Sequence, residues 1–571
     1  MKTRQDPYSY PEKEQLLLDY KNDHITKTAD LPEDKPFAEL LTESGLKVNE
    51  NGIYQEFKTG GIRKISNFLN IEYLFNKVQD NQKLRFLKID DTIFKISPED
   101  LVSRQNFRKL LLSTNYNLSC SSRQFNKMVN IIIKMDNGKI INDTTGYGRI
   151  ADHIYNFCNK ILVNNVLRDF VPVVWLGKKG YYLNKTDMLH VTDAPFDPSQ
   201  LWNTFFKLYG RQAVLIIGFA VASLFFQEYM KKEKKFPLLY IKAGSGRGKT
   251  GLTELIENLF GIKHPFSNIN CSSNSTKIGI ENKSILLNNL PLILNELTEK
   301  KFEFIKSRYD GQGSVKYSGF KPGNISERSV NGSTIITTVV EPKDKQIISR
   351  CVFVNLDDIE MNETAFEQAR TLSKKWASFT CTVLKNISFG DLITQIKQVK
   401  KRIHCSGIQP RISDNYSIIG GCFLAFKSLL TSRNDLPDVE KLKNFLLGEM
   451  KKTENFLNPL IYFLRELERL SECKISHRYI TQDENYLYFN FNGVWSLISQ
   501  AYKAKYLPFI TSSNIRNLLK KSRYIAHYGS NFEANAKNSA GEPVTAFLKH
   551  IKDTSRRCFV LIKSELPCYY S

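Results

Sequence analysis

The segment 243–250 constrains the fold of this 571-residue chain more than any other feature. It reads Ala-Gly-Ser-Gly-Arg-Gly-Lys-Thr. The short apolar run Pro237–Lys242 precedes it, and apolar residues at helical spacing follow over Gly251–Phe260. A strand, a glycine-rich turn, Lys-Thr and a helix in this order form a P-loop. The flanking strand and helix favour this interpretation over a chance glycine-rich turn, so we expect an α/β core that binds a nucleotide.

The loop predicts a site for ATP and Mg²⁺. Glycines let backbone N–H groups converge on phosphate oxygens, and the helix N-terminus adds a partial positive charge. Lys249 is expected to reach the β- and γ-phosphates, and Thr250 to hold Mg²⁺. The first motif position is alanine instead of glycine, which is a tolerated variant. The predicted nucleotide-binding residues are Ala243, Gly244, Ser245, Gly246, Arg247, Gly248, Lys249, Thr250 and Gly251.

Composition and charge limit the class of protein. A hydrophobic content of 42% indicates a folded globular chain, and its length predicts three or more domains. The formal net charge of +23 favours a polyanionic partner such as DNA. An anionic membrane surface is the other candidate partner, and solubility alone is the third interpretation of the charge.

No targeting or membrane segment is expected. Residues 1–15 contain no apolar core, so they do not resemble a secretory signal. Ala213–Phe226 is the only long apolar run; at about 14 residues it is too short to cross a bilayer and is expected to be a buried helix. The ten cysteines include no CxxC pair, so we expect neither a zinc site nor a disulfide framework, and a cytoplasmic location.

The pattern along the chain predicts a multidomain α/β fold. Its predicted parts are an extended or loosely ordered segment (1–50), an α+β domain that forms a DNA collar or binds a partner (51–200), the ATPase domain (201–400), a helical lid or linker (401–473) and a winged-helix-like domain (474–571). Within the second part, Asp90 and Asp91 form the one tempting carboxylate pair. Adjacent residues on a strand point to opposite faces, so a hairpin turn is favoured over a fused primase site.

A P-loop needs an acidic strand to hydrolyse ATP, and Leu290–Glu296 fits that role about 45 residues after Lys249. Glu296 is the predicted base that orients the attacking water. The preceding position usually carries aspartate, which helps to hold Mg²⁺, but here it is Asn295. Its carbonyl can accept a hydrogen bond from a metal-bound water without bringing charge. The alternative is an ordinary buried strand that ends in a solvated glutamate.

The run Ser333–Val340 predicts a further strand, which would carry a polar sensor of the γ-phosphate, either Thr337 or Thr338. Arg350 follows, just before the last apolar strand of the core. It is a candidate arginine finger for the nucleotide of a neighbouring subunit, and this role would require a ring or filament. A surface arginine in a salt bridge is the alternative.

Between the acidic and sensor strands, the segment 311–324 has the pattern of an inserted β-hairpin. Lys316 and Lys321 are candidate contacts to DNA phosphates, and Tyr317 or Phe320 could stack on bases. The alternative is a solvated hairpin whose lysines protect a sheet edge.

This order of motifs resembles the AAA+ helicases that carry a hairpin before sensor 1, a group that includes superfamily 3 and MCM-like helicases. Upstream, the segments NGIYQEF, RKISNFLNIEYLF and RFLKIDDTIFKISPEDL resemble the region before the ATPase in phage-island ATPases. Within this group, the chain resembles the self-loading replication initiator helicases of staphylococcal pathogenicity islands and cassette chromosomes. The resemblance covers about residues 50–430.

The resemblance implies an origin-binding hexameric helicase that draws one DNA strand through a central pore. Lys249, Thr250 and Glu296 would carry out hydrolysis, Arg350 would be the finger, and Lys316 and Lys321 would contact DNA. Single- and double-stranded DNA, a replication origin, further copies of the chain and host replication proteins are the implied partners. Asn295 departs from the family pattern, which puts tight Mg²⁺ binding or fast turnover in doubt.

The C-terminal part predicts a second DNA contact. Thr511–Lys521 has the pattern of a short helix with basic residues Arg516, Lys520 and Lys521, and a glycine- and asparagine-rich loop follows it. Such a helix can enter the major groove. A small packing or oligomerisation domain is the alternative. For the whole chain, the alternatives to a helicase are an ATP-gated DNA-binding switch and a basic ATPase that acts on membranes or protein partners.

Overall fold

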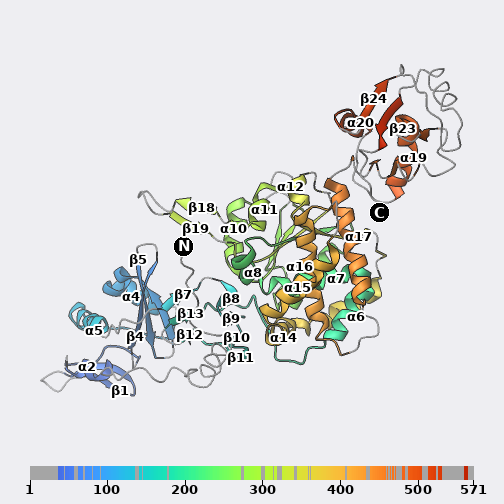
Figure 1. Ribbon diagram of the computed structural model, residues 1–571. Helices are drawn as coiled ribbons and strands as arrows, with labels where there is room; N and C mark the ends of the chain where they lie inside the picture. The colour runs from blue at the N-terminus through green and yellow to red at the C-terminus, as the bar shows by residue number, and fades with distance from the viewer. Residues whose placement is uncertain are drawn as a thin grey trace, which may run out of the picture.

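The computed structural model describes the chain between residues 37 and 563, with gaps. The described residues are 37–43, 45–56, 62–68, 71–79, 82–90, 92–112, 114–134, 141–144, 146–176, 179–271, 275–297, 302–312, 314–317, 325–328, 330–339, 342, 344–357, 359–360, 362–404, 408–431, 437–457, 460, 463–464, 466–467, 470, 479–482, 486–504, 512–522, 525–529 and 558–563. Figure 1 shows their elements in three bodies that follow one another in chain order.

The first body packs small antiparallel sheets and helices around its own apolar core. Its elements are α2 (Phe37–Glu43), β1 (Lys47–Asn49), β2 (Gly52–Glu56), β3 (Ile62–Lys64), β4 (Ile71–Gln79), β5 (Gln82–Ile89), β6 (Thr92–Ile96), α3 (Pro98–Val102), α4 (Arg104–Leu111) and α5 (Ser122–Lys134). The segment 37–50 differs from the loosely ordered chain expected there, because Phe37, Leu41 and Leu46 are buried in this core. Residues 1–36 lie outside the described residues. Asp90 occupies the tight turn between β5 and β6, as predicted.

Two further sheets connect this region to the rest of the chain. One contains β7 (Ile141–Asp143), β12 (Val173–Leu176) and β13 (Lys179–Tyr182). The other has the order β11-β10-β9-β8-β16, with β8 (Tyr147–Ala151), β9 (Ile154–Asn156), β10 (Lys160–Val163), β11 (Val166–Asp169) and β16 (Leu287–Asn288). β16 comes from the middle of the ATPase region and pairs in parallel with β8. The N-terminal strands and the central body therefore share one sheet.

The central body is built on a parallel sheet with the order β15-β17-β20-β14-β21. The strands are β14 (Leu238–Lys242), β15 (Asn268–Asn270), β17 (Leu292–Asn295), β20 (Thr334–Thr338) and β21 (Cys351–Asn355). Most of their residues are buried, and β14, β17 and β21 are mainly apolar, as expected for strands covered on both faces. The hairpin β18 (Ser314–Tyr317) and β19 (Ile325–Arg328) interrupts the chain between β17 and β20, as predicted.

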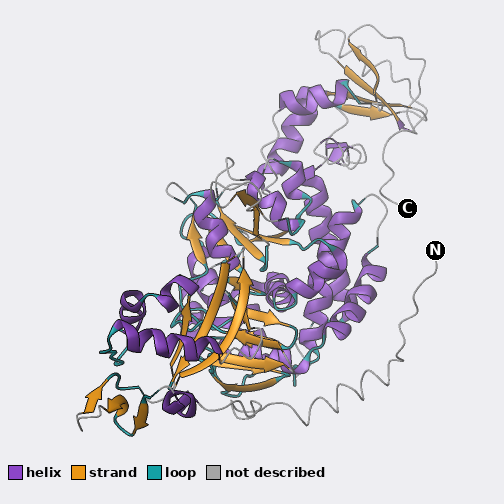
Figure 2. Ribbon diagram, turned by 90° about the vertical axis from the view of Figure 1, so that its left-hand side faces the viewer, coloured by secondary structure: helices purple, strands orange, loops and turns teal. Residues whose placement is uncertain are grey.

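Helices enclose this sheet, as the two views of the ribbon show (Figures 1 and 2). They are α6 (Pro198–Tyr209), α7 (Ala213–Ser223), α8 (Phe226–Glu233), α9 (Lys249–Leu259), α10 (Lys277–Ile285), α11 (Phe302–Tyr309), α12 (Lys345–Ile348), α13 (Glu363–Ser373), α14 (Phe379–Asn386), α15 (Phe389–Ile403), α16 (Pro410–Lys427) and α17 (Val439–Leu457), with short 3₁₀ turns at Gly210–Gln212 and Trp376–Ser378.

The apolar run in this body is a core helix. Every residue of α7 is buried, and the helix packs against α16 and β21. By length and composition alone, the helical stretch Pro198–Ser223 could cross a membrane, but 72% of its apolar window is buried inside the protein. This burial agrees with the predicted core helix.

The third body is a small sheet with the order β22-β23-β25-β24 and its own apolar core. It comprises β22 (Ile480–Gln482), β23 (Tyr486–Asn490), α19 (Phe491–Ala504), α20 (Ser512–Lys520), β24 (Ile525–Gly529) and β25 (Cys558–Ile562). The predicted basic helix corresponds to α20. The glycine- and asparagine-rich loop that follows the helix in the sequence, at 529–543, lies outside the described residues apart from Gly529.

Candidate nucleotide site

The candidate catalytic residues other than Arg350 lie at the carboxyl edge of the parallel sheet. The P-loop follows β14, Glu296 follows β17, and Thr337 lies near the end of β20. Because all five strands are parallel, their carboxyl ends lie at one edge, where ligands of open α/β sheets bind. β20 separates β14 from β17, so the predicted sensor strand lies between the P-loop and the acidic residue.

The P-loop has the backbone that phosphate binding requires. Gly246 and Gly248 both have a φ of +75°, a left-handed conformation that glycine adopts without a steric penalty. α9 begins at Lys249, two residues earlier than predicted, and no side chain caps its first turn. The uncapped N–H groups and the helix dipole therefore remain available for an anion. Alanine is compatible with position 243, which directly follows β14 and is fully buried.

The side chain of Lys249 contacts the backbone of the P-loop. Its Nζ donates hydrogen bonds to the backbone oxygens of Ala243 at 2.6 Å and Gly244 at 3.3 Å. Burial lowers the pKa of this ammonium group, while the carboxylates of Glu296 and Asp357 oppose that shift. Both carboxylates are thus close enough to Lys249 to act on it electrostatically.

Asn295 and Thr337 are partners in the β17–β20 register, and their side chains are hydrogen-bonded. The Asn295 amide nitrogen also donates to Oδ1 of Asn268 on β15, at 2.6 Å. Asn268 makes a long contact of 3.5 Å with the hydroxyl of Thr253, which donates to the backbone oxygen of Thr250 at 2.8 Å. A chain of polar groups therefore connects the sensor strand with the residue predicted to hold Mg²⁺.

Glu296 is exposed and has a φ of +50°, which is strained for a residue with a side chain. Its N–H donates to the backbone oxygen of Thr337 at 2.7 Å, which holds it in this conformation. Strained residues of this kind are often found at active sites. Thr338, the other candidate sensor, is also buried, at the end of β20.

Asp357 is a residue that the sequence analysis missed. It follows β21, and its Oδ1 accepts a hydrogen bond from the N–H of Gly244 at 2.6 Å. Its Oδ2 lies 3.8 Å from Nζ of Lys242. The signal was present in principle, since an acidic residue follows the last core strand, but its contact with the loop depends on the pairing of β21 with β14.

Arg350 lies at the opposite, amino edge of the sheet, just before β21. Its side chain is 13% exposed and forms an ion pair of 3.2 Å with Asp310. The guanidinium also lies 5.5 Å from the ring centre of Tyr309, and Arg411 is placed 5.7 Å from the same ring. The intrachain ion pair corresponds to the alternative considered for Arg350, and a role toward a second subunit stays a prediction.

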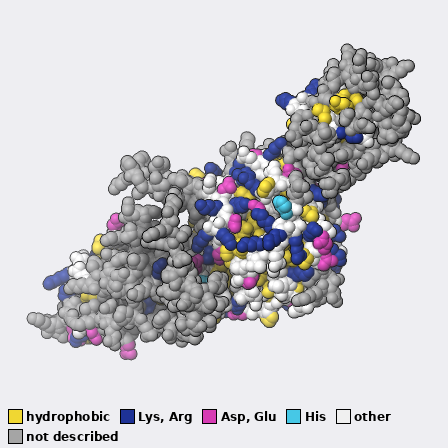
Figure 3. Space-filling view, viewed as in Figure 1, with side chains coloured by type: hydrophobic (Ala, Val, Ile, Leu, Met, Phe, Trp, Pro, Cys, Tyr) yellow, Lys and Arg dark blue, Asp and Glu magenta, His cyan; other side chains and the backbone are white. Residues whose placement is uncertain are grey.

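The predicted DNA contacts belong to the inserted hairpin and to the third body. Lys316 and Tyr317 are on β18, for which only the backbone is described, and Lys321 lies outside the described residues. In the third body, Arg516 donates to Oδ1 of Asn492 and lies 4.8 Å from the ring centre of Phe491. Lys520 and Lys521, near the end of α20, are exposed. Figure 3 shows Lys and Arg side chains spread over the visible face of the central body.

The residues at the sheet edge fit ATP and Mg²⁺. The uncapped start of α9 and the two left-handed glycines suit phosphate oxygens. The hydroxyl of Thr250 and the carboxylate of Glu296 are the kind of oxygen ligands that Mg²⁺ prefers. The Asn295 amide adds an oxygen but no charge.

Comparison with known proteins gives a structural relative but no sequence relative. No protein-family model matches the chain, and neither does any curated protein sequence. Among solved structures, SCCmec type IV Cch, described as an active helicase, aligns with a TM-score of 0.54 and 11% identity, covering 88% of this chain and 99% of Cch. Two apo structures of the NrS-1 C-terminal region align with TM-scores of 0.30 and 0.29, which are too low to show a common fold. The chain therefore has a multidomain α/β fold similar to that of a known helicase.

Proposed function

We propose that this chain is an ATP-driven DNA helicase and replication initiator of a mobile genetic element, which moves along single-stranded DNA as a ring and recognises its origin. One observation carries the proposal: the P-loop, Glu296 and Thr337 share one sheet edge, and a hairpin is inserted between the last two. In this proposal the hairpin contacts DNA, and it lies in the chain between two residues that act on the γ-phosphate. The fold shared with an active helicase supports it.

Each residue at the edge has a definite task in this proposal. The P-loop N–H groups and Lys249 hold the β- and γ-phosphates, and Glu296 orients the attacking water. Thr337 contacts the γ-phosphate and, through its bond to Asn295, connects that contact to the predicted metal site. Bound ATP supplies the bond that is hydrolysed, and Mg²⁺ neutralises the phosphate charge.

The oligomer and the DNA contacts follow from the same reasoning. Arg350 would complete the site of a neighbouring subunit, which requires a ring, and six subunits are the number that the resemblance implies. Lys316, Tyr317 and Lys321 would contact the single strand, while Arg516, Lys520 and Lys521 would contact the double-stranded origin. The net charge of +23 supports a polyanionic partner. Host replication proteins are candidate partners of the N-terminal body.

A second candidate function is an ATP-gated DNA-binding switch that marks an origin, or acts in defence, without processive unwinding. Asn295 favours it, because an uncharged residue at this position weakens the hold on Mg²⁺ and slow hydrolysis suits a switch.

Strand separation of a forked DNA duplex with ATP and Mg²⁺ tests the proposal, with wild type beside Lys249→Ala. We expect wild type to unwind the duplex, and the variant to lose hydrolysis and unwinding together. Unwinding by the variant would contradict the assignment of this P-loop. Hydrolysis by wild type without unwinding, combined with tight ATP-dependent DNA binding, would favour the switch.

A further inference from the structure

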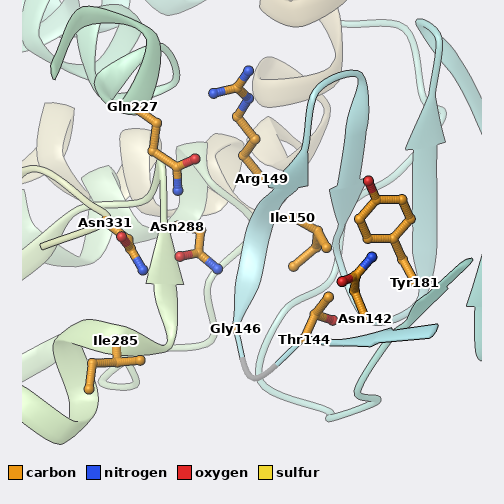
Figure 4. A pocket seen from close by; sticks show the side chains of 10 residues that line it. All are labelled: Asn142, Thr144, Gly146, Arg149, Ile150, Tyr181, Gln227, Ile285, Asn288 and Asn331. Atoms are coloured by element: carbon orange, nitrogen blue, oxygen red, sulfur yellow. The ribbon is translucent and has the colours of Figure 1, made fainter. Parts of the chain in front are cut away.

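A polar pocket of about 380 Å³ lies where the N-terminal sheets meet the central body, away from the P-loop. This volume falls within the range of small-molecule sites, roughly 300–1,000 Å³. Figure 4 shows Gln227, Asn288 and Asn331 on one side, with Asn142, Thr144 and Tyr181 on the other. Most of its lining side chains thus carry neutral hydrogen-bonding groups.

Asn288 is the central group of this pocket. Its residue is only 8% exposed, and its side chain lines the pocket (Figure 4). This amide offers both an N–H donor and an oxygen acceptor to a ligand in the pocket. Gly146 makes room for it, because a Cβ at that position would lie 2.0 Å from Nδ2 of Asn288.

The walls of the pocket are fixed in place by the neighbouring Asn289, which is fully buried. Its Oδ1 accepts a hydrogen bond from the N–H of Gln227 at 2.8 Å, and its own N–H donates to the backbone oxygen of Asn331 at 2.9 Å. Its Nδ2 donates to the backbone oxygen of Leu224 at 2.6 Å. The amide-bearing positions are therefore held before any ligand enters, which lowers the entropic cost of binding.

The charges around the pocket disfavour a phosphate as its occupant. Arg149 is the only charged residue among those that line the pocket, and its guanidinium already pairs with Asp152 at 2.7 Å and with Glu228 at 3.2 Å. Amide side chains instead offer donors and acceptors in one plane, the pattern by which asparagine and glutamine recognise the edge of a base. Tyr181 adds an aromatic face on which a base can stack.

We propose that this pocket binds a neutral nucleobase, through the amides of Asn288 and Gln227. The base would belong to the single-stranded DNA on which the chain acts, and this source rests on the proposed function. Asn331 supports that source, because it lies three residues after Arg328, where the hairpin strand β19 ends. A single DNA strand held by the hairpin would therefore pass the base of the hairpin, where Asn331 forms part of one wall of the pocket. A free nucleoside has the same chemistry and is the other source.

The test compares the affinity of wild type, Asn288→Leu and Gln227→Leu for labelled single strands, using fluorescence anisotropy without ATP. One strand carries bases, and a second of equal length and charge is abasic. Asn386→Leu, which changes an exposed amide on α14, is the matched control. Equilibrium dialysis with adenosine, guanosine, cytidine and thymidine covers the free nucleosides, and basal ATP hydrolysis checks that each variant is folded.

We expect both pocket variants to lose roughly tenfold in affinity for the base-bearing strand, the loss of about one base contact, with unchanged affinity for the abasic strand. A loss confined to a nucleoside would support the pocket and assign it to free nucleosides. Equal binding of every probe by both variants and wild type would overturn the proposal. If wild type fails to unwind a fork but the pocket variants still lose base binding, the proposed function fails and the pocket stands.

Discussion

The hydroxyl of Thr337 is hydrogen-bonded to the side-chain oxygen of Asn295, across the register that pairs β20 with β17. Because the Asn295 nitrogen donates to Asn268 at 2.6 Å, both ends of this amide are used. An aspartate at the same place would keep the acceptor for Thr337 but lose the donor for Asn268. Asn295 thus connects β15, β17 and β20. It does so at the position where an aspartate usually supplies a negative charge that helps to hold the metal.

Asn295→Asp is therefore expected to lower the Mg²⁺ concentration needed for half-maximal ATP hydrolysis by roughly tenfold, because a carboxylate next to the metal strengthens its binding. The measurement is a Mg²⁺ titration of hydrolysis, with Asn386→Asp as a control for an added surface charge. An unchanged Mg²⁺ requirement would mean that residue 295 does not face the metal.

Asp357→Ala should weaken ATP binding by roughly tenfold. The N–H of Gly244 would lose a hydrogen bond to a carboxylate, which is worth about 1.5–3 kcal/mol, and the start of the P-loop would no longer be held. The dissociation constant of a fluorescent ATP analogue measures the effect. Glu360→Ala removes an exposed carboxylate nearby and should leave binding unchanged. Tighter binding by Asp357→Ala would show instead that the carboxylate competes with the phosphates.

Arg350→Ala should lower ATP hydrolysis by about a thousandfold while ATP binding persists, if Arg350 stabilises the transition state in a neighbouring subunit. Asp310→Ala removes only its intrachain partner and should retain most of the activity. Arg411→Ala changes the other arginine beside Tyr309 and serves as a second control. Similar losses in the Arg350 and Asp310 variants would indicate that the ion pair is structural.

The double variant Lys316→Ala, Lys321→Ala is expected to keep basal ATP hydrolysis and to lose its stimulation by single-stranded DNA, since two phosphate contacts disappear. Hydrolysis rates with and without a single strand provide the readout. Lys397→Ala with Lys401→Ala removes the same charge from exposed positions on α15. An unaltered DNA response in the hairpin variant would exclude the hairpin from the mechanism.

Gly421→Ala should destabilise the central body by about 1–3 kcal/mol, as overpacking does. A Cβ there would lie 2.5 Å from the backbone of Ile396, at the contact between α16 and α15. Gly448→Ala on α17 meets open space and should stabilise by about 0.5–1 kcal/mol through helix propensity. Urea unfolding of the full chain distinguishes the two, and equal midpoints would contradict this packing argument.

Features of the site with a local signal could be predicted from the sequence. The glycines and Lys-Thr of the P-loop, the apolar strands and the inserted hairpin are found where expected, although β17 and β20 are shorter than their apolar runs. Asp357 could not be assigned in this way, because it is 113 residues away from Gly244 and meets it only through strand pairing. The prediction of a loosely ordered chain is wrong for the segment 37–50. This segment contains charged residues, but three of its apolar side chains are buried in a core.

The two residues Leu287 and Asn288 form a strand that belongs to the ATPase region by position and to the N-terminal sheet by hydrogen bonding. A Cβ on Gly148, opposite them, would lie 2.0 Å from the backbone oxygen of Asn288. If recombination replaced the first 200 residues, the incoming strand would have to pair with β16 in place of β8. That strand would also need a glycine at the position of Gly148. The N-terminal region and the ATPase are therefore expected to be inherited together, and not exchanged as separate modules.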